Sequence, residues 1–200
     1  QIQSMGLYKG LYMERYNLSH LDVLIVDRNP HMLAILRTAL HELGLVKLRD
    51  INDPEKAFQM FKDQQADLIF SDWVPGRDEL KFLNMVRDTN KSPNPFVPII
   101  IVTAYCEQAN VIAARDLGMT EFLAAPVSVK SIYSHICSVI KDKRPFIKEP
   151  KFFGPDRRRH EGNVPSDERR SMVAPPEVEA EVEAKPDSKP ESGAKGDEES

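Results

Sequence analysis

The sequence predicts an α/β fold: a five-stranded parallel sheet, doubly wound, with helices on both of its faces. Between residues 20 and 143, short apolar runs rich in β-branched residues alternate five times with segments of helical period. Strands joined in this way by helices run parallel with right-handed crossovers. A hydrophobic content of 41% over 200 residues is enough for one domain with tails.

Five apolar runs are predicted to be the strands. They span residues 21–26, 46–51, 68–72, 99–102 and 121–124. The first, third and fourth are almost continuously apolar rather than alternating, which is typical of strands buried on both faces. The third ends on Asp72 and is followed by a break at Pro75-Gly76.

Five amphipathic helices are predicted to follow the strands. Asn29-Pro30 and Asp53-Pro54 are helix starts, with a capping side chain followed by a proline in the first turn. Ser128 is predicted to cap the last helix, and Gly44 and Gly118 to end two others. The apolar positions of the remaining two helices lie within 80–86 and 111–117.

Four regions are expected along the chain. They are an N-terminal arm (1–19), the folded domain (20–143), an arginine-rich extension (144–170) and an acidic tail (171–200). Phe146, Phe152 and Phe153 are predicted to pack the extension against the domain. The tail has few apolar residues, and from Pro175 onward it carries nine acidic residues and three lysines. We therefore expect it to be disordered.

Composition excludes several classes of protein. No apolar run approaches the ~20 residues of a membrane span, and residues 1–16 lack the core of a signal peptide. Cys106 and Cys137 have no metal-site or disulfide spacing, and both are expected to be buried free thiols. The histidines are scattered, with no spacing that supports a catalytic set. We expect a cytoplasmic protein that is not an enzyme and does not bind DNA.

Polar residues follow three of the predicted strands. Asp27-Arg28 comes after the first, Asp72 ends the third, and Thr103 follows the fourth. The carboxyl ends of parallel strands form the edge where open α/β sheets bind ligands. A lone aspartate there commonly caps the next turn, but three such strand ends together favour a site.

With these strand ends, residues 21–142 resemble the receiver domain of bacterial two-component response regulators, of the flavodoxin-like chemotaxis-regulator type. The matching motifs are Val26-Asp27, Ser71-Asp72-Trp73, Pro75-Gly76-Arg77-Asp78, Val102-Thr103-Ala104 and Phe122-Leu123-Ala124-Ala125-Pro126. Each is weak alone, but their shared order and spacing make the resemblance specific.

The resemblance implies that Asp72 accepts a phosphoryl group from a histidine kinase or a phosphotransfer protein. It implies a Mg²⁺ ion held by Asp27, Asp72 and the carbonyl of Val74, since a hard cation prefers oxygen ligands and offsets charge on a transferred phosphoryl group. Thr103 would contact the phosphoryl oxygens, and Phe122 would be the aromatic switch.

The resemblance also implies a docking face for a downstream protein. That face comprises Ala104, Val111, Phe122 and the helix that starts at Ser128.

Four positions depart from the family pattern. Arg28 stands in place of the second acidic residue, and Ala125 in place of a lysine. Only Val74 separates Trp73 from Pro75, and Glu79 stands where glycine is usual. Arg28 either pairs with one of the two aspartates through its planar guanidinium or points into solvent. A cation at this position predicts weak or absent Mg²⁺ binding.

The first hypothesis is therefore a divergent, single-domain receiver that acts through protein–protein contacts, with Asp72 as a weakened phosphoacceptor. A conventionally phosphorylated receiver is the near alternative. An alternative of another class is a cyclic di-GMP-binding effector that uses Arg157–Arg159, Arg169 and Arg170, because arginine forks suit phosphates and guanine edges. The same arginines also fit a solvated charge run balanced by neighbouring acidic residues.

Overall fold

The predicted fold class is confirmed by the structure, a computed structural model that describes residues 16–74, 80–142, 144–149 and 152–156, and the backbone of 171–173 and 181–182. The central sheet consists of β2 (Asp22–Val26), β3 (Lys47–Ile51), β4 (Leu68–Asp72), β5 (Ile99–Thr103) and β6 (Glu121–Ala124). All neighbours are parallel, in the order β3-β2-β4-β5-β6. The carboxyl ends of all five strands therefore lie at one edge.

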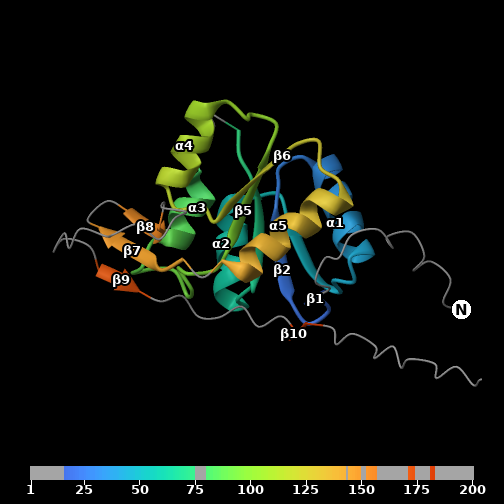
Figure 1. The fold of residues 1–200 in the computed structure, drawn as a ribbon, viewed down its shortest axis with the longest axis horizontal. Coiled ribbons are helices and arrows are strands. Elements are labelled where there is room, and N and C mark those ends of the chain that lie inside the picture. The colour runs from blue at the N-terminus through green and yellow to red at the C-terminus, as the bar shows by residue number, and fades with distance from the viewer. Residues whose placement is uncertain are drawn as a thin grey trace, which may run out of the picture.

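Helices cover both faces of this sheet (Figure 1). They are α1 (Pro30–Glu42), α2 (Pro54–Asp63), α3 (Lys81–Arg87), α4 (Gln108–Asp116) and α5 (Val129–Lys141). The buried residues of α1 and α5 form one apolar cluster with the sheet, and those of α2, α3 and α4 form a second cluster. The sheet is thus the middle of three layers.

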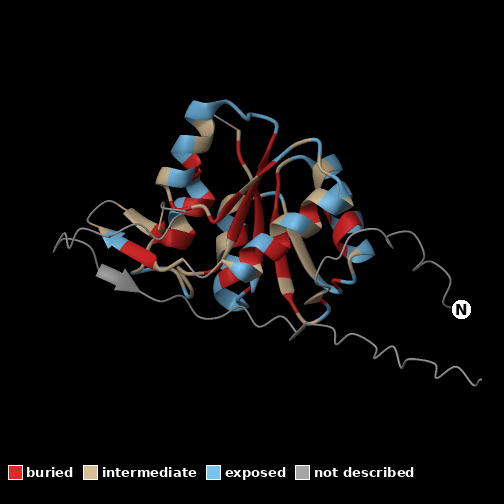
Figure 2. Cartoon of the chain, viewed as in Figure 1, coloured by how far each residue is buried: buried red, intermediate tan, exposed pale blue. Residues whose placement is uncertain are grey.

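Alternate residues of the central strands pack into these two clusters. In β2, Val23 and Ile25 lie in the cluster of α1 and α5, whereas Leu24 and Val26 lie in the cluster of α2, α3 and α4. All four are at most 2% exposed, and Figure 2 shows the strands as the buried centre of the molecule. Burial on both faces explains why these strands read as continuous apolar runs.

The predicted helix caps are confirmed. The side chain of Asn29 accepts a hydrogen bond from the N–H of His31 at the start of α1, and Asp53 caps α2 in the same manner. Ser128 and Ser131 form a reciprocal capping box at the start of α5.

Two predicted features differ in the structure. Cys106 is exposed and precedes α4, so its prediction as a buried helical thiol is wrong, whereas Cys137 is buried in α5 as expected. Both thiols are free. The fourth helix also begins earlier than its apolar period indicates, because the polar turn from Gln108 precedes the first partly buried residues.

Beyond α5 the chain forms an antiparallel hairpin of β7 (Phe146–Glu149) and β8 (Phe152–Pro155). β9 (Ser171–Val173) pairs with the other edge of β7. The rings of Phe146 and Phe153 each lie 5.2 Å from the ring of Phe96. The predicted packing of these two phenylalanines against the domain is therefore confirmed.

A second short pair joins the two terminal regions, where β1 (Tyr16–Asn17) runs antiparallel to β10 (Glu181–Val182). β9 and β10 fall within the tail that we expected to be disordered, so the backbone differs from that expectation at these five residues. The rest of the tail and residues 1–15 lie outside the described residues. In the part of the chain that is described, no helix is long and apolar enough to cross a membrane.

Candidate functional site

Two carboxylates lie side by side at the carboxyl edge of the sheet. Asp72 is the last residue of β4, and Asp27 directly follows β2. β2 and β4 are neighbours in register, with Val26 opposite Ser71. Asp27 is only 5% exposed and Asp72 is half-buried. The sheet therefore brings together the two acidic residues that sequence analysis singled out.

Both carboxyl groups resist ionisation. Burial raises the pKa of Asp27 to about 6, and the nearby charge of Asp72 adds to that rise. A hydrogen bond of 2.7 Å from the N–H of Asn29 to Asp27 Oδ1 opposes it. Burial also raises the pKa of Asp72. Such a pair favours a proton or a cation between its members.

Arg28 is the cationic residue beside Asp72. Its backbone N–H donates to Asp72 Oδ2 over 3.3 Å, and its positive charge lowers the pKa of Asp72, although burial has the larger effect. Arg28 also lines a hollow next to Asp72. The residue thus partly neutralises the acceptor carboxylate, in the same sense as a bound cation would.

The hollow beside Asp72 contains residues that sequence analysis missed. Leu80 and Lys81, at the start of α3, line it together with Val74 and Trp73. Leu80 adopts the left-handed conformation, with φ 57°, which costs about 1–2 kcal/mol in a residue other than glycine. Lys81 forms an ion pair with Glu55 of α2. No local sequence pattern predicts this placement, because it depends on where α3 packs against the sheet. Glu79, noted above as a departure, lies outside the described residues.

Thr103, the last residue of β5, is buried and faces the loop after Asp72. Its hydroxyl donates to the carbonyl of Trp73 over 2.7 Å and accepts from the N–H of Tyr105 over 3.1 Å. The carbonyl of Thr103 accepts from the N–H of Ala125 at 2.9 Å. The hydroxyl is therefore engaged with backbone groups on both sides of the site.

Phe122 and Ala125 occupy the β6 side of this edge. Phe122 is half-buried and packs against the apolar cluster of α2, α3 and α4. Ala125 precedes a cis peptide bond to Pro126 and brings no amino group to the site. The positive charges that line the hollow in the described part of the chain come instead from Arg28 and Lys81.

The residues present offer a limited ligand set for a divalent cation. Asp27 and Asp72 supply two neighbouring carboxylates, and Val74 lines the hollow together with Asp72. Within residues 16–74, 80–142, 144–149 and 152–156, no group of three or more His, Cys, Asp or Glu side chains could hold a metal ion. Mg²⁺ prefers several oxygen ligands in octahedral geometry, and Arg28 lies beside Asp72 at the hollow.

The arginines that motivated the cyclic di-GMP alternative, Arg157–Arg159, Arg169 and Arg170, lie outside the described residues. That alternative stays a prediction.

Comparison with known proteins gives a consistent result. The family model of the response regulator receiver domain matches residues 23–137. A probable chemotaxis protein CheY of Rhizobium etli is 32% identical over 118 residues, which are 58% of this chain and 90% of that protein. The chemotaxis protein CheY of Pseudomonas aeruginosa is 25% identical over 115 residues, which are 57% of this chain and 91% of that protein.

Solved structures share the fold. The chemotaxis response regulator CheY4 of Vibrio cholerae superposes with a TM-score of 0.53 at 21% identity, covering 60% of this chain and 98% of that one. The receiver domain of the sensor histidine kinase PA1611 of Pseudomonas aeruginosa, solved with magnesium in its active-site cleft, gives 0.53 at 24% identity, covering 61% of this chain and 98% of that one.

Proposed function

Because the chain belongs to the response regulator receiver domain family, we propose that it is a divergent receiver that signals through protein–protein contacts, with Asp72 as a weakened phosphoacceptor. As a receiver domain it is a component of two-component signalling. Its upstream partner is a histidine kinase or a phosphotransfer protein, and its output is a downstream protein.

The observation that carries this proposal is the position of Arg28 beside Asp72. Its positive charge lowers the pKa of the acceptor carboxylate, at the position where the family resemblance implies a second acidic ligand. Exchanging a carboxylate for a guanidinium changes the local charge by two units, and one unit pair near a surface is worth about 4 kcal/mol at 4 Å before solvation. Mg²⁺ binding is therefore weak or absent, and phosphorylation of Asp72 is slow.

Exposed apolar residues support output through a protein partner. Tyr105, after β5, is 47% exposed, and Ile112 on α4 is 38% exposed. Tyr105 donates its N–H to the hydroxyl of Thr103, and Ile112 belongs to the helix that the resemblance assigns to the docking face. Large exposed apolar side chains are typical of interaction surfaces when they occur together.

The test is labelling by acetyl phosphate and Mg²⁺, read on a Phos-tag gel. We expect little labelling of the native chain and none of Asp72→Asn. Arg28→Asp restores a carboxylate at the metal position and should raise the labelling rate by about tenfold or more. Arg115→Asp makes the same charge change on the exposed surface of α4 and should leave labelling unchanged.

Two results would decide against the proposal. Rapid labelling of the native chain that is lost in Asp72→Asn indicates a conventional receiver. An Arg28→Asp variant that labels no better than the native chain removes Arg28 as the cause of weak phosphorylation.

A further inference from the structure

Arg87, the last residue of α3, is a buried cation at the end of the sheet opposite Asp72. The residue is 5% exposed, and burial lowers the pKa of its guanidinium to about 9. Its guanidinium donates to the carbonyls of Pro95, Val97 and Gly118 over 2.7–2.8 Å and to Thr120 Oγ1 over 3.4 Å. These acceptors belong to the segments that lead into β5 and β6. Arg87 therefore joins α3 to the amino ends of two strands.

The β7–β8 hairpin covers this buried cation. The ring of Phe146 lies 5.3 Å from Arg87 Cζ, a distance at which a guanidinium and an aromatic face attract each other. Phe146 and Ile147 are at most 7% exposed. Because Phe146 also packs with Phe96 and Phe153, lifting the hairpin would expose both an aromatic cluster and one side of Arg87.

The hairpin also packs against the C-terminal end of α4. Gly154 of the hairpin and Gly118 after α4 lie so close together that neither has room for a side chain. A Cβ atom on Gly154 would lie 2.5 Å from the Cα of Gly118, and one on Gly118 would lie 2.4 Å from the carbonyl oxygen of Phe153. Gly118 ends α4 with φ 90°. Gly154 has no positive φ, so the close approach, and not its backbone conformation, requires glycine there.

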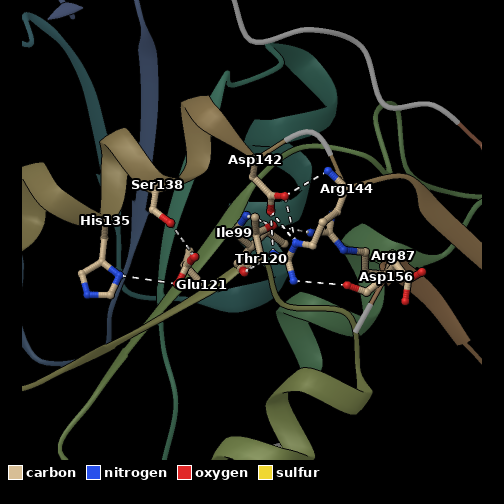
Figure 3. A network of polar contacts seen from close by, with 9 residues as sticks. All are labelled: Arg87, Ile99, Thr120, Glu121, His135, Ser138, Asp142, Arg144 and Asp156. Carbon is tan, nitrogen blue, oxygen red and sulfur yellow. Dashed lines mark hydrogen bonds and ion pairs between the residues drawn. The ribbon is translucent and has the colours of Figure 1, made fainter. Parts of the chain in front are cut away.

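Arg144 fixes the base of the hairpin (Figure 3). Its guanidinium pairs with Asp142 at the end of α5, with Nη2–Oδ2 at 2.5 Å. The same side chain donates over 3.2 Å to the carbonyls of Thr120 and Asp156. It therefore ties the end of α5, the start of β6 and the end of β8 to one another.

The short helix α3 links this covered end to the candidate site. Leu80 to Leu83, at its start, line the hollow beside Asp72, and Arg87 lies under the hairpin at its other end. Leu80, Leu83 and Val86 share one apolar cluster with Trp73, the only tryptophan of the chain. α3 thus runs from the guanidinium that the hairpin covers to the apolar cluster that contains Trp73.

We propose that the β7–β8 hairpin is a latch on the receiver. Docked over Arg87 and Gly118, it holds α3 and the end of α4; lifted, it loosens both helices and alters the hollow beside Asp72. This inference goes beyond the proposed function and does not depend on phosphorylation of Asp72. β9 pairs with the other edge of β7, so the hairpin is held on that side as well.

Hydrogen–deuterium exchange of the full chain tests the latch with Gly154→Ala, which inserts a methyl group at the contact with Gly118. Alanine normally stabilises a strand relative to glycine. Faster exchange in this variant would therefore be due to the lost close contact between residues 154 and 118. We expect amides of 81–87 and 114–120 to exchange about tenfold faster, and the emission of Trp73 to shift to the red. Lys148→Ala places the same residue, alanine, at an exposed position of β7 that has no such close contact and should change neither readout.

Arg144→Lys is a second variant, which keeps the charge and the Gly118–Gly154 contact but loses the forked pairing. It should give the same local pattern with a smaller increase. Faster exchange confined to residues 144–156, with 81–87 and Trp73 unchanged, overturns the proposal because the hairpin is then a passive attachment. Faster exchange that extends to α1 in both variants also overturns it, since the hairpin then belongs to the cooperative core. Unchanged exchange throughout in Gly154→Ala removes the contact on which the latch depends.

Discussion

At the scale of single residues, the buried carboxylate of Asp27 at the carboxyl edge of the sheet has a negative charge that its surroundings do not fully stabilise. Asp27 is almost completely buried next to Asp72, and its pKa is raised to about 6, first by burial and then by that neighbour. The folded state therefore binds a proton in a pH range where the unfolded chain has released it. The contribution of Asp27 to stability must therefore fall as the pH rises from its ordinary pKa of 3.8 to about 6.

Asp27→Asn should remove this dependence. The amide resembles the protonated acid in shape and carries no charge, so the variant should match the native chain near pH 4. At pH 7 it should be more stable by about 2–3 kcal/mol, since each pKa unit corresponds to about 1.4 kcal/mol. Urea unfolding at the two pH values measures the difference. Asp63→Asn, at an exposed position at the end of α2, is the control, and a native chain equally stable at both values would contradict the prediction.

At the scale of elements, local chemistry specifies most helix starts. The caps at Asn29, Asp53 and Ser128 could be predicted because each depends on residues at most three positions apart. The starts of α3 and α4 have no side-chain cap. The left-handed conformation of Leu80 before α3 corresponds to no sequence pattern that marks a helix start. Those two boundaries are set by tertiary packing, which a single sequence does not display.

The capping box of α5 allows a quantitative prediction. In Ser128→Ala the N–H of Ser131 loses its acceptor, a bond of 3.1 Å, and Ser131 Oγ keeps only its own bonds to the backbone of residue 128. We expect the free energy of unfolding to decrease by about 1 kcal/mol. Ser134→Ala, in the exposed interior of the same helix, should be neutral or slightly stabilising. Equal effects of both changes would show that the cap contributes nothing.

The candidate site was also predictable only in part. The sequence predicts features that depend on nearby residues or on the topology of the sheet, but not contacts between residues far apart in the chain. Asp27, Asp72 and Thr103 lie at the carboxyl ends of strands, and parallel strands bring these ends to one edge, so pattern and topology together predict their proximity. The bond from Thr103 to the carbonyl of Trp73 joins residues thirty positions apart. Lys81 reaches the hollow only because α3 starts where it does. Such contacts depend on three-dimensional placement and could not be predicted.

At the scale of the molecule, the two ends of the sheet differ in chemistry. The carboxyl end has two carboxylates with raised pKa values and a hollow lined by Arg28 and Lys81. The amino end of β5 and β6 is closed by Arg87, Arg144 and the hairpin that follows α5. An open, charged end suits exchange with partners, whereas the closed end supports the strands as long as the hairpin is docked.

The closed end predicts a large cost for a small change at Arg87. Lysine has a single compact ammonium group in place of the planar guanidinium. In Arg87→Lys this group cannot donate to the carbonyls of Pro95, Val97 and Gly118 at the same time. Each buried carbonyl left without a donor costs about 1–3 kcal/mol. We expect urea unfolding at pH 7 to show a loss of about 2–4 kcal/mol, against less than about 0.5 kcal/mol for Arg115→Lys, whose pair with Asp116 is exposed. A loss at Arg87 no greater than that at Arg115 would mean that water reaches these carbonyls and that this end of the sheet is open, because only solvent could then replace the missing donors.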